Sequence, residues 1–188
     1  WVLMDVRDTT HVVTVAAPDR LGLLALVAGV LSLNRLNVLA ARVTTVDRRA
    51  VQEWTVRPAF GDPPSVEQLS DDIRRAVEGT YDVAARLAKR DAEYARRPRL
   101  DRPEPIVIVT NAGLSTTTLL EVRAHDEPGL LHRVARAVAS AGATIVGAKV
   151  STLGADVVDV FFVTDSSGDR LVGERVETLR ATVLSSLQ

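Results

Sequence analysis

Residues 19–24 read Asp-Arg-Leu-Gly-Leu-Leu, and residues 126–131 read Asp-Glu-Pro-Gly-Leu-Leu. A segment rich in valine, threonine or leucine precedes each copy of this loop, at residues 11–17 and 118–122. Aligning Gly22 with Gly129 gives an offset of 107 residues, which is too long for a solenoid repeat and suits a small domain. The chain is therefore interpreted as a tandem of two related modules.

Hydrophobic spacing outside the loop predicts the same order of elements in both copies: strand, helix, strand, strand, helix. The helix after the first loop is expected to end near Asn34, in a left-handed cap. An extra strand precedes each copy, at residues 2–6 and 106–109. The remaining predicted segments are 11–17, 24–34, 38–46, 50–56 and a helical insert at 65–97 in the first copy, and 117–122, 130–141, 143–152, 157–164 and 172–187 in the second.

Helices at matching positions should cover one face of an antiparallel sheet, which predicts an α+β fold of two ferredoxin-like βαββαβ modules. We expect residues 106–109 to be the fourth strand of the first module. Residues 2–6 would then close the second module, within the chain or from a partner molecule. The predicted units are an extra strand at 1–10, a first module at 11–111 and a second module at 112–188. The missing fourth strand also leaves open a dimerisation or docking module.

Composition excludes several classes of protein. Of the 188 residues 46% are hydrophobic, the net charge is −1 and no cysteine is present. We therefore expect a folded domain without disulfides, and no binding to nucleic acid or membranes. No apolar run reaches the roughly 18 residues of a membrane helix, and no signal peptide is recognised. The chain begins with Trp1, so we interpret it as part of a longer, cytoplasmic protein.

The repeated loop is the best candidate for a binding site. A helix that begins there exposes backbone N–H groups and the positive end of its dipole, which together attract a carboxylate. Glycine lets a ligand approach the backbone, and Asp19 or Asp126 could bind an ammonium group. This combination predicts a free amino acid as ligand. The alternative is that Asp-x-x-Gly merely starts a helix, with the acid near the N-cap and Pro128 in the first turn.

The strand, the Asp-Arg-x-Gly-Leu-Leu loop, the helix and Leu-Asn-Val at 36–38 together resemble an ACT domain. The second copy is more similar, through residues 118–134, the segment Ala-Lys-Val-Ser-Thr-Leu-Gly at 148–154, and Val-Val-Asp-Val-Phe-Phe-Val-Thr-Asp at 157–165. In tandem these copies resemble the C-terminal region of the bifunctional uridylyltransferase/uridylyl-removing enzymes. Tandem ACT domains also occur in other enzymes and in transcription regulators, which stay as alternatives.

The resemblance implies a regulatory module that senses an amino acid, with glutamine favoured. It implies as partners the catalytic domains of a parent chain and, through them, the PII protein; a homodimer is a further expectation. The parent would transfer uridylyl or adenylyl groups with Mg²⁺ and a nucleoside triphosphate, whereas no cofactor is expected here. The site residues implied are Asp19, Arg20, Leu21, Gly22 and Leu23 with Asn37 and Val38 in the first copy, and Asp126, Glu127, Pro128, Gly129 and Leu130 with Thr144 and Ile145 in the second.

Each copy departs from the family pattern at one position. Leu21 stands where the family has proline, and Thr144 stands where the second strand opens with asparagine. The two sites are therefore expected to differ in affinity, or only one of them to bind. No catalytic or metal-binding motif is recognised in the chain. The basic run at 86–102 predicts either a solvated face or a docking surface.

Overall fold

The computed structural model describes residues 1–7, 9–94, 103–111, 116–153 and 155–188. Within these ranges, no helix is long and apolar enough to span a membrane. The elements, in chain order, are β1 (Val2–Arg7), β2 (Thr10–Pro18), α1 (Leu23–Leu33), β3 (Leu36–Val46), β4 (Arg49–Pro58), α2 (Val66–Glu78), α3 (Val83–Tyr94), β5 (Ile106–Thr110), β6 (Thr118–His125), α4 (Leu130–Ser140), β7 (Thr144–Leu153), β8 (Asp156–Thr164) and α5 (Glu174–Ser185).

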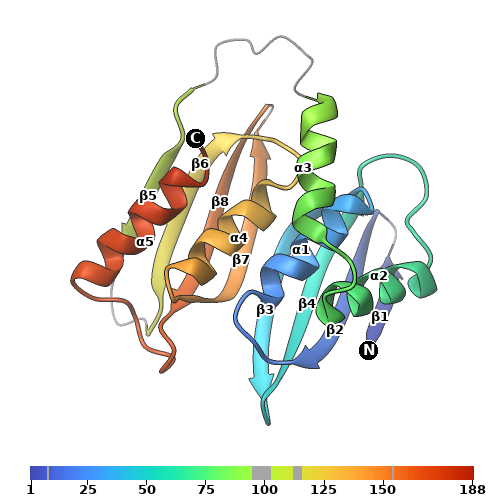
Figure 1. Ribbon diagram of the computed structural model, residues 1–188, viewed down its shortest axis with the longest axis horizontal. Helices are drawn as coiled ribbons and strands as arrows, with labels where there is room; N and C mark the ends of the chain where they lie inside the picture. The colour runs from blue at the N-terminus through green and yellow to red at the C-terminus, as the bar shows by residue number, and fades with distance from the viewer. Residues whose placement is uncertain (8, 95–102, 112–115, 154) are drawn as a thin grey trace.

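All strands in the described residues join one antiparallel sheet, in the order β1-β2-β4-β3-β7-β8-β6-β5. Figure 1 shows the helices gathered on one face of this sheet. Strand residues alternate between that face and the other, so β8 buries Val157, Phe161 and Val163 beneath the helices. The predicted α+β architecture of two ferredoxin-like modules is confirmed.

The source of the fourth strand differs from the prediction in both modules. β1 pairs with β2 along its whole length, so residues 2–6 complete the first module and not the second. β5 pairs with β6, so residues 106–109 belong beside the second module. A short connection makes each leading strand a hairpin partner of the strand that follows it. Within the described residues neither module lacks its fourth strand, which removes the observation that suggested a docking module.

The modules meet along β3 and β7 in a symmetrical contact. Ala41 pairs with Ala148, its own equivalent in the repeat, while Ala40 pairs with Lys149 and Arg42 with Gly147. The helices obey the same symmetry, because His132 Nδ1 lies 2.7 Å from the carbonyl oxygen of Ala25, at a separation of 107 residues. A pseudo-twofold axis therefore relates the modules, as in an isologous dimer interface.

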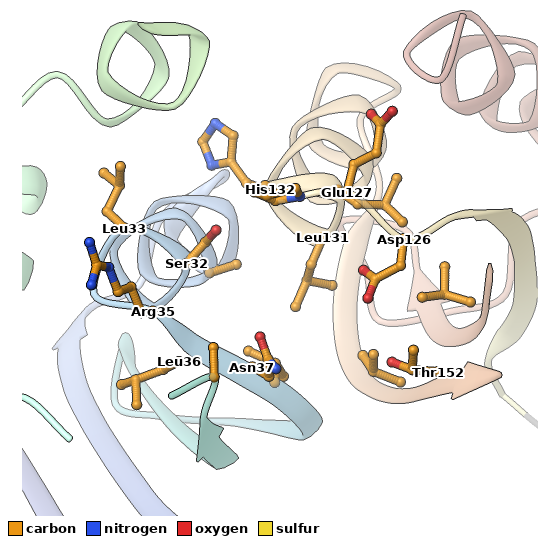
Figure 2. Close-up of a pocket in the computed structure, with 18 of the residues that line it drawn as sticks. Ser32, Leu33, Arg35, Leu36, Asn37, Asp126, Glu127, Leu131, His132 and Thr152 are labelled. Atoms are coloured by element: carbon orange, nitrogen blue, oxygen red, sulfur yellow. The ribbon is translucent and has the colours of Figure 1, made fainter. Parts of the chain in front are cut away.

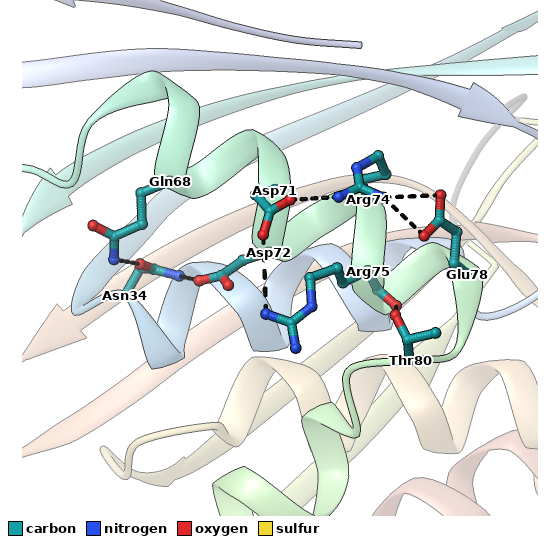
Figure 3. A network of polar contacts seen from close by, with 8 residues as sticks. All are labelled: Asn34, Gln68, Asp71, Asp72, Arg74, Arg75, Glu78 and Thr80. Carbon is teal, nitrogen blue, oxygen red and sulfur yellow. Dashed lines mark hydrogen bonds and ion pairs between the residues drawn. The ribbon is translucent and has the colours of Figure 1, made fainter.

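The helical insert of the first module packs beside α1. Its first helix, α2, has Ser65 as its N-cap, whose Oγ accepts from the Gln68 N–H at 3.2 Å. Side chains of α2 also bind the end of α1, where Asn34 Nδ2 donates to Asp72 Oδ2 at 3.0 Å and Gln68 Nε2 donates to Asn34 Oδ1 at 3.1 Å (Figure 3). α2 thus holds in place the turn between α1 and β3.

Candidate ligand site between the two modules

The glycine loops have the same backbone conformation in both modules. Gly22 has φ 83° and Gly129 has φ 80°, and each is the N-cap of its helix without a side-chain cap hydrogen bond. The helices begin at Leu23 and Leu130, so the expected position of Pro128 in the first turn was wrong. The acids do not cap the helices either: Asp19 Oδ2 accepts from Thr45 Oγ1 at 3.0 Å. The interpretation of the acid as a cap is therefore wrong.

A cavity of about 450 Å³ lies beside the loop of the second module and is called here the Gly129 pocket. One wall is the segment from Asp126 to His132, and the opposite wall is the end of α1 and the start of β3 in the first module. Figure 2 shows the Asp126 carboxylate and Asn37 on opposite sides of this space, whereas the Glu127 carboxylate points away from Asn37. The pocket size lies in the range of small-molecule sites.

A second cavity of about 220 Å³, called here the Gly22 pocket, is the symmetry equivalent of the first. It lies between the loop of the first module and the end of α4 with the start of β7 in the second module. Both cavities arise because the pseudo-twofold axis brings the loop of each module to the second strand of the other.

Every predicted site residue lines one of the two pockets, but the expected pairing within each copy is wrong. The Gly129 pocket contains Asp126, Glu127, Pro128, Gly129 and Leu130 together with Asn37 and Val38. The Gly22 pocket contains Asp19, Arg20, Leu21, Gly22 and Leu23 together with Thr144 and Ile145. The exchange follows from the β3–β7 contact, which places each strand opening against the loop of the other module.

The walls of the Gly129 pocket carry opposite charges. The second module supplies Asp126, Glu127 and Asp159, and the first supplies Arg35 and Arg90. Burial raises the pKa of Asp126, and the neighbouring His125 opposes this rise. Arg90 on α3 also donates to the carbonyl oxygen of Ser32 at 2.6 Å, so the insert helix reaches the rim of the pocket.

Three residues of this pocket were not predicted. Arg35, and not Asn34, takes the left-handed conformation after α1, with φ 58°, where the second module has Gly142. His132 is buried, and burial lowers its pKa. Asp159 is buried on β8. A charged residue at an inward position of a strand was the available signal for Asp159, whereas Arg35 and His132 needed the tertiary contacts.

The family comparison decides the class of the second module. The ACT domain family matches residues 118–181, the span from the start of β6 to within α5. This segment is an ACT domain. The loop of this ACT domain forms one wall of the Gly129 pocket. The first module has the same order of elements, including the leading strand and the glycine loop.

Curated relatives extend the likeness over most of the chain. Bifunctional uridylyltransferase/uridylyl-removing enzymes match from Streptomyces coelicolor at 40% identity over 93% of this chain, and from Mycobacterium tuberculosis at 37% over 80%. The enzyme from Gluconobacter oxydans matches at 33% over 93%. These alignments cover 22%, 20% and 19% of the relatives, so the chain spans about a fifth of their length. The chain is homologous to a part of these enzymes.

The regulatory subunit of aspartate kinase from Thermus thermophilus, in its ligand-free form, aligns over 100% of this chain and 97% of that chain. The TM-score is 0.26 and the identity 16%, which is too little to carry an argument about this chain.

Proposed function

We propose that this chain is an amino-acid-sensing regulatory module and that the Gly129 pocket binds L-glutamine. The observation that carries the proposal is the opposite charge of the two pocket walls. An amino acid has a carboxylate and an ammonium group a short distance apart, so a pocket with cations on one side and carboxylates on the other complements it. Burial of Asp126 and Asp159 strengthens the attraction of the ammonium group because the effective dielectric constant falls there.

The groups around the pocket support a specific orientation. Asp126 faces the space and accepts the ammonium group, while the first-turn N–H groups of α4 and the guanidinium of Arg35 attract the carboxylate. Asn37, on the opposite wall, offers a donor and an acceptor to a side-chain amide. An amide-bearing amino acid therefore satisfies more of these groups than an apolar one does.

We further propose that only the Gly129 pocket binds. The exchange between modules places Pro128 and Asn37, both of the family pattern, in the same pocket. The Gly22 pocket has Leu21 and Thr144 instead and is half the size. Each copy lacks one of the two family residues, proline or asparagine. The Gly129 pocket nevertheless contains both residue types, and the Gly22 pocket contains neither.

Binding between the modules offers a route to regulation. A ligand that contacts both walls stabilises one packing of the modules over others, and any activity linked to that packing changes with it. By analogy with the relatives, we propose that the parent chain carries catalytic domains that add and remove nucleotidyl groups, uridylyl or adenylyl, on the PII protein. Mg²⁺ and a nucleoside triphosphate would act in those domains and not in this chain.

Titration calorimetry of the 188-residue chain with L-glutamine tests this proposal, with L-glutamate and L-asparagine as controls. We expect selective binding of glutamine with a stoichiometry of one per chain. Two equivalent sites would contradict the argument for a single pocket. Absence of heat together with an unchanged melting temperature for all three amino acids would contradict the sensing function.

A further inference from the structure

Asp159 is a buried carboxylate that the fold itself satisfies only in part. It lies on the helix-covered face of β8, is 1% exposed and forms part of the Gly129 pocket. Its Oδ1 has no hydrogen-bond partner among the described residues. An unpaired buried carboxylate is costly, so such a group in a pocket indicates a partner that comes from outside the chain.

The first module shows what this position looks like when it is satisfied internally. Gln52 pairs with Val15 across the sheet, as Asp159 pairs with Val122. Gln52 Oε1 accepts from Trp54 Nε1 at 3.3 Å, whereas the residue equivalent to Trp54 is Phe161, which has no donor. The fold therefore accommodates a neutral amide here, and Asp159 is not required by the architecture.

We propose that Asp159 is a ligand-binding residue that accepts hydrogen bonds from the ammonium group of the amino acid in the Gly129 pocket. This inference rests on the proposed function and extends it to a residue outside the glycine loop. Asp126 lines the same pocket, so an ammonium group near both carboxylates is held by two charge-assisted hydrogen-bond acceptors. Gln52 replaces the second carboxylate in the Gly22 pocket, which weakens that pocket for the same group.

The surroundings of Asp159 make this contact dependent on pH. Burial, with a smaller contribution from the charge of Asp126, raises the pKa of Asp159 to about 7, and a hydrogen bond from the backbone N–H of Ser151 limits this rise. The other charged or titratable groups around the pocket are Glu127 on the loop, His132 on α4, Arg90 on α3 and Arg35 before β3. A bound ammonium group favours the ionised carboxylate, so binding releases a proton when the pH is below about 7.

Calorimetry of the 188-residue chain at pH 6 and pH 8 tests the inference. The ligands are L-glutamine and 5-amino-5-oxopentanoic acid, which is glutamine without its α-ammonium group. We expect glutamine to bind several-fold more tightly at pH 8 than at pH 6, and Asp159→Asn to weaken glutamine binding at pH 8 by about tenfold or more. The weak binding of the deaminated compound should not change with Asp159→Asn. Asp19→Asn, the same carboxylate-to-amide change in the Gly22 pocket, should leave both ligands unaffected.

The possible outcomes separate this inference from the proposed function. If the wild type binds glutamine and Asp159→Asn binds it with the same affinity, the role of Asp159 is overturned and the sensing function stays in place. Equal losses for both ligands would also overturn it. If Asp159→Asn does not fold, the affinities of the wild type for the two ligands at pH 6 and pH 8 test the inference. It is overturned if the ratio of the glutamine affinity to the affinity for the deaminated compound is the same at both pH values. No binding of any standard amino acid would overturn both proposals.

Discussion

Gly22 and Gly129 share a left-handed backbone but have different neighbours. A Cβ on Gly22 meets no heavy atom within 4 Å in the described residues, whereas a Cβ on Gly129 lies 3.3 Å from Leu87 Cδ2 on α3. The difference arises because α3, which follows α2 in the first module, packs against the loop of the second module. The backbone explains why both positions are glycine, and the neighbour explains why the two loops are not equivalent.

We expect Gly22→Ala and Gly129→Ala each to lower the free energy of unfolding by about 1–2 kcal/mol, because an L-residue is strained at these φ values. Urea unfolding measures this cost. Only Gly129→Ala should also weaken glutamine binding, so Gly22→Ala is the matched control. Equal weakening by the two variants would show that the pockets act alike.

Asp159 also makes stability depend on pH. Its pKa is about 7 in the folded chain, against 3.8 for an unperturbed aspartate carboxyl, so the folded state holds the proton more tightly. The resulting destabilisation is absent below about pH 4, grows as the pH rises, and is complete above about pH 7. Asp159→Asn removes it, so the variant should gain stability relative to wild type by on the order of 4 kcal/mol between pH 4 and pH 8.

Chemical denaturation of both proteins at several pH values tests this change. The difference between the two curves isolates Asp159 from the other carboxyl groups. A constant difference from pH 4 to pH 8 would show that the Asp159 carboxyl titrates normally.

At the scale of elements, α1 contacts α3 and α4 through a glycine. A Cβ on Gly29 would overlap Val83 Cγ1 and lie 2.8 Å from His132 Nδ1. Gly29 therefore permits the close approach of three helices, one from each module and one from the insert. This packing holds α3 over the rim of the Gly129 pocket, where Arg90 donates to Ser32.

Gly29→Ala should destabilise the chain by about 1–3 kcal/mol, as overpacked core variants do. In an unobstructed helix the same change would stabilise by roughly 0.5–1 kcal/mol, so the sign of the effect tests the packing. Thermal unfolding of Gly29→Ala, of Val83→Ala and of the double variant measures it. The double variant should lose less stability than the sum of the single losses, because Val83→Ala removes part of the overlap. A stabilising Gly29→Ala would contradict this packing.

At the scale of the whole molecule, the pseudo-twofold axis makes the two pockets equivalent in position, but different residues line them. The Gly129 pocket needs residues from both modules, so a substitution in the first module should affect a site whose loop lies in the second. We expect Asn37→Thr to weaken glutamine binding by about tenfold, the size of one lost buried hydrogen bond.

Introducing the missing elements should activate the other pocket. Leu21→Pro with Thr144→Asn places in the Gly22 pocket the residue types of Pro128 and Asn37. We expect the calorimetric stoichiometry to rise from one toward two, with a weaker second site because Gln52 replaces Asp159. Adding Asn37→Thr to this double variant should weaken the original site by about tenfold and leave the new site unchanged. An unchanged stoichiometry of one would show that the Gly22 pocket lacks more than these two side chains.

The sequence by itself determined the repeat, the order of elements, the class of the fold and the loop residues of both pockets. These features depend on local signals: hydrophobic period, turn residues and glycine at a left-handed position. The departures from the family pattern at Leu21 and Thr144 were also visible there, although the fact that both residues line one pocket was not.

Only the tertiary structure decided which loop meets which strand. The pairing of β3 with β7 joins residues about a hundred positions apart, and no local pattern encodes that contact. Because of this pairing, each loop lies against the second strand of the other module. Pro128, Asn37 and the buried Asp159 therefore line the same pocket. The same topology placed β1 beside β2 and β5 beside β6, because a hairpin partner close in sequence requires a shorter loop to be closed than a distant one.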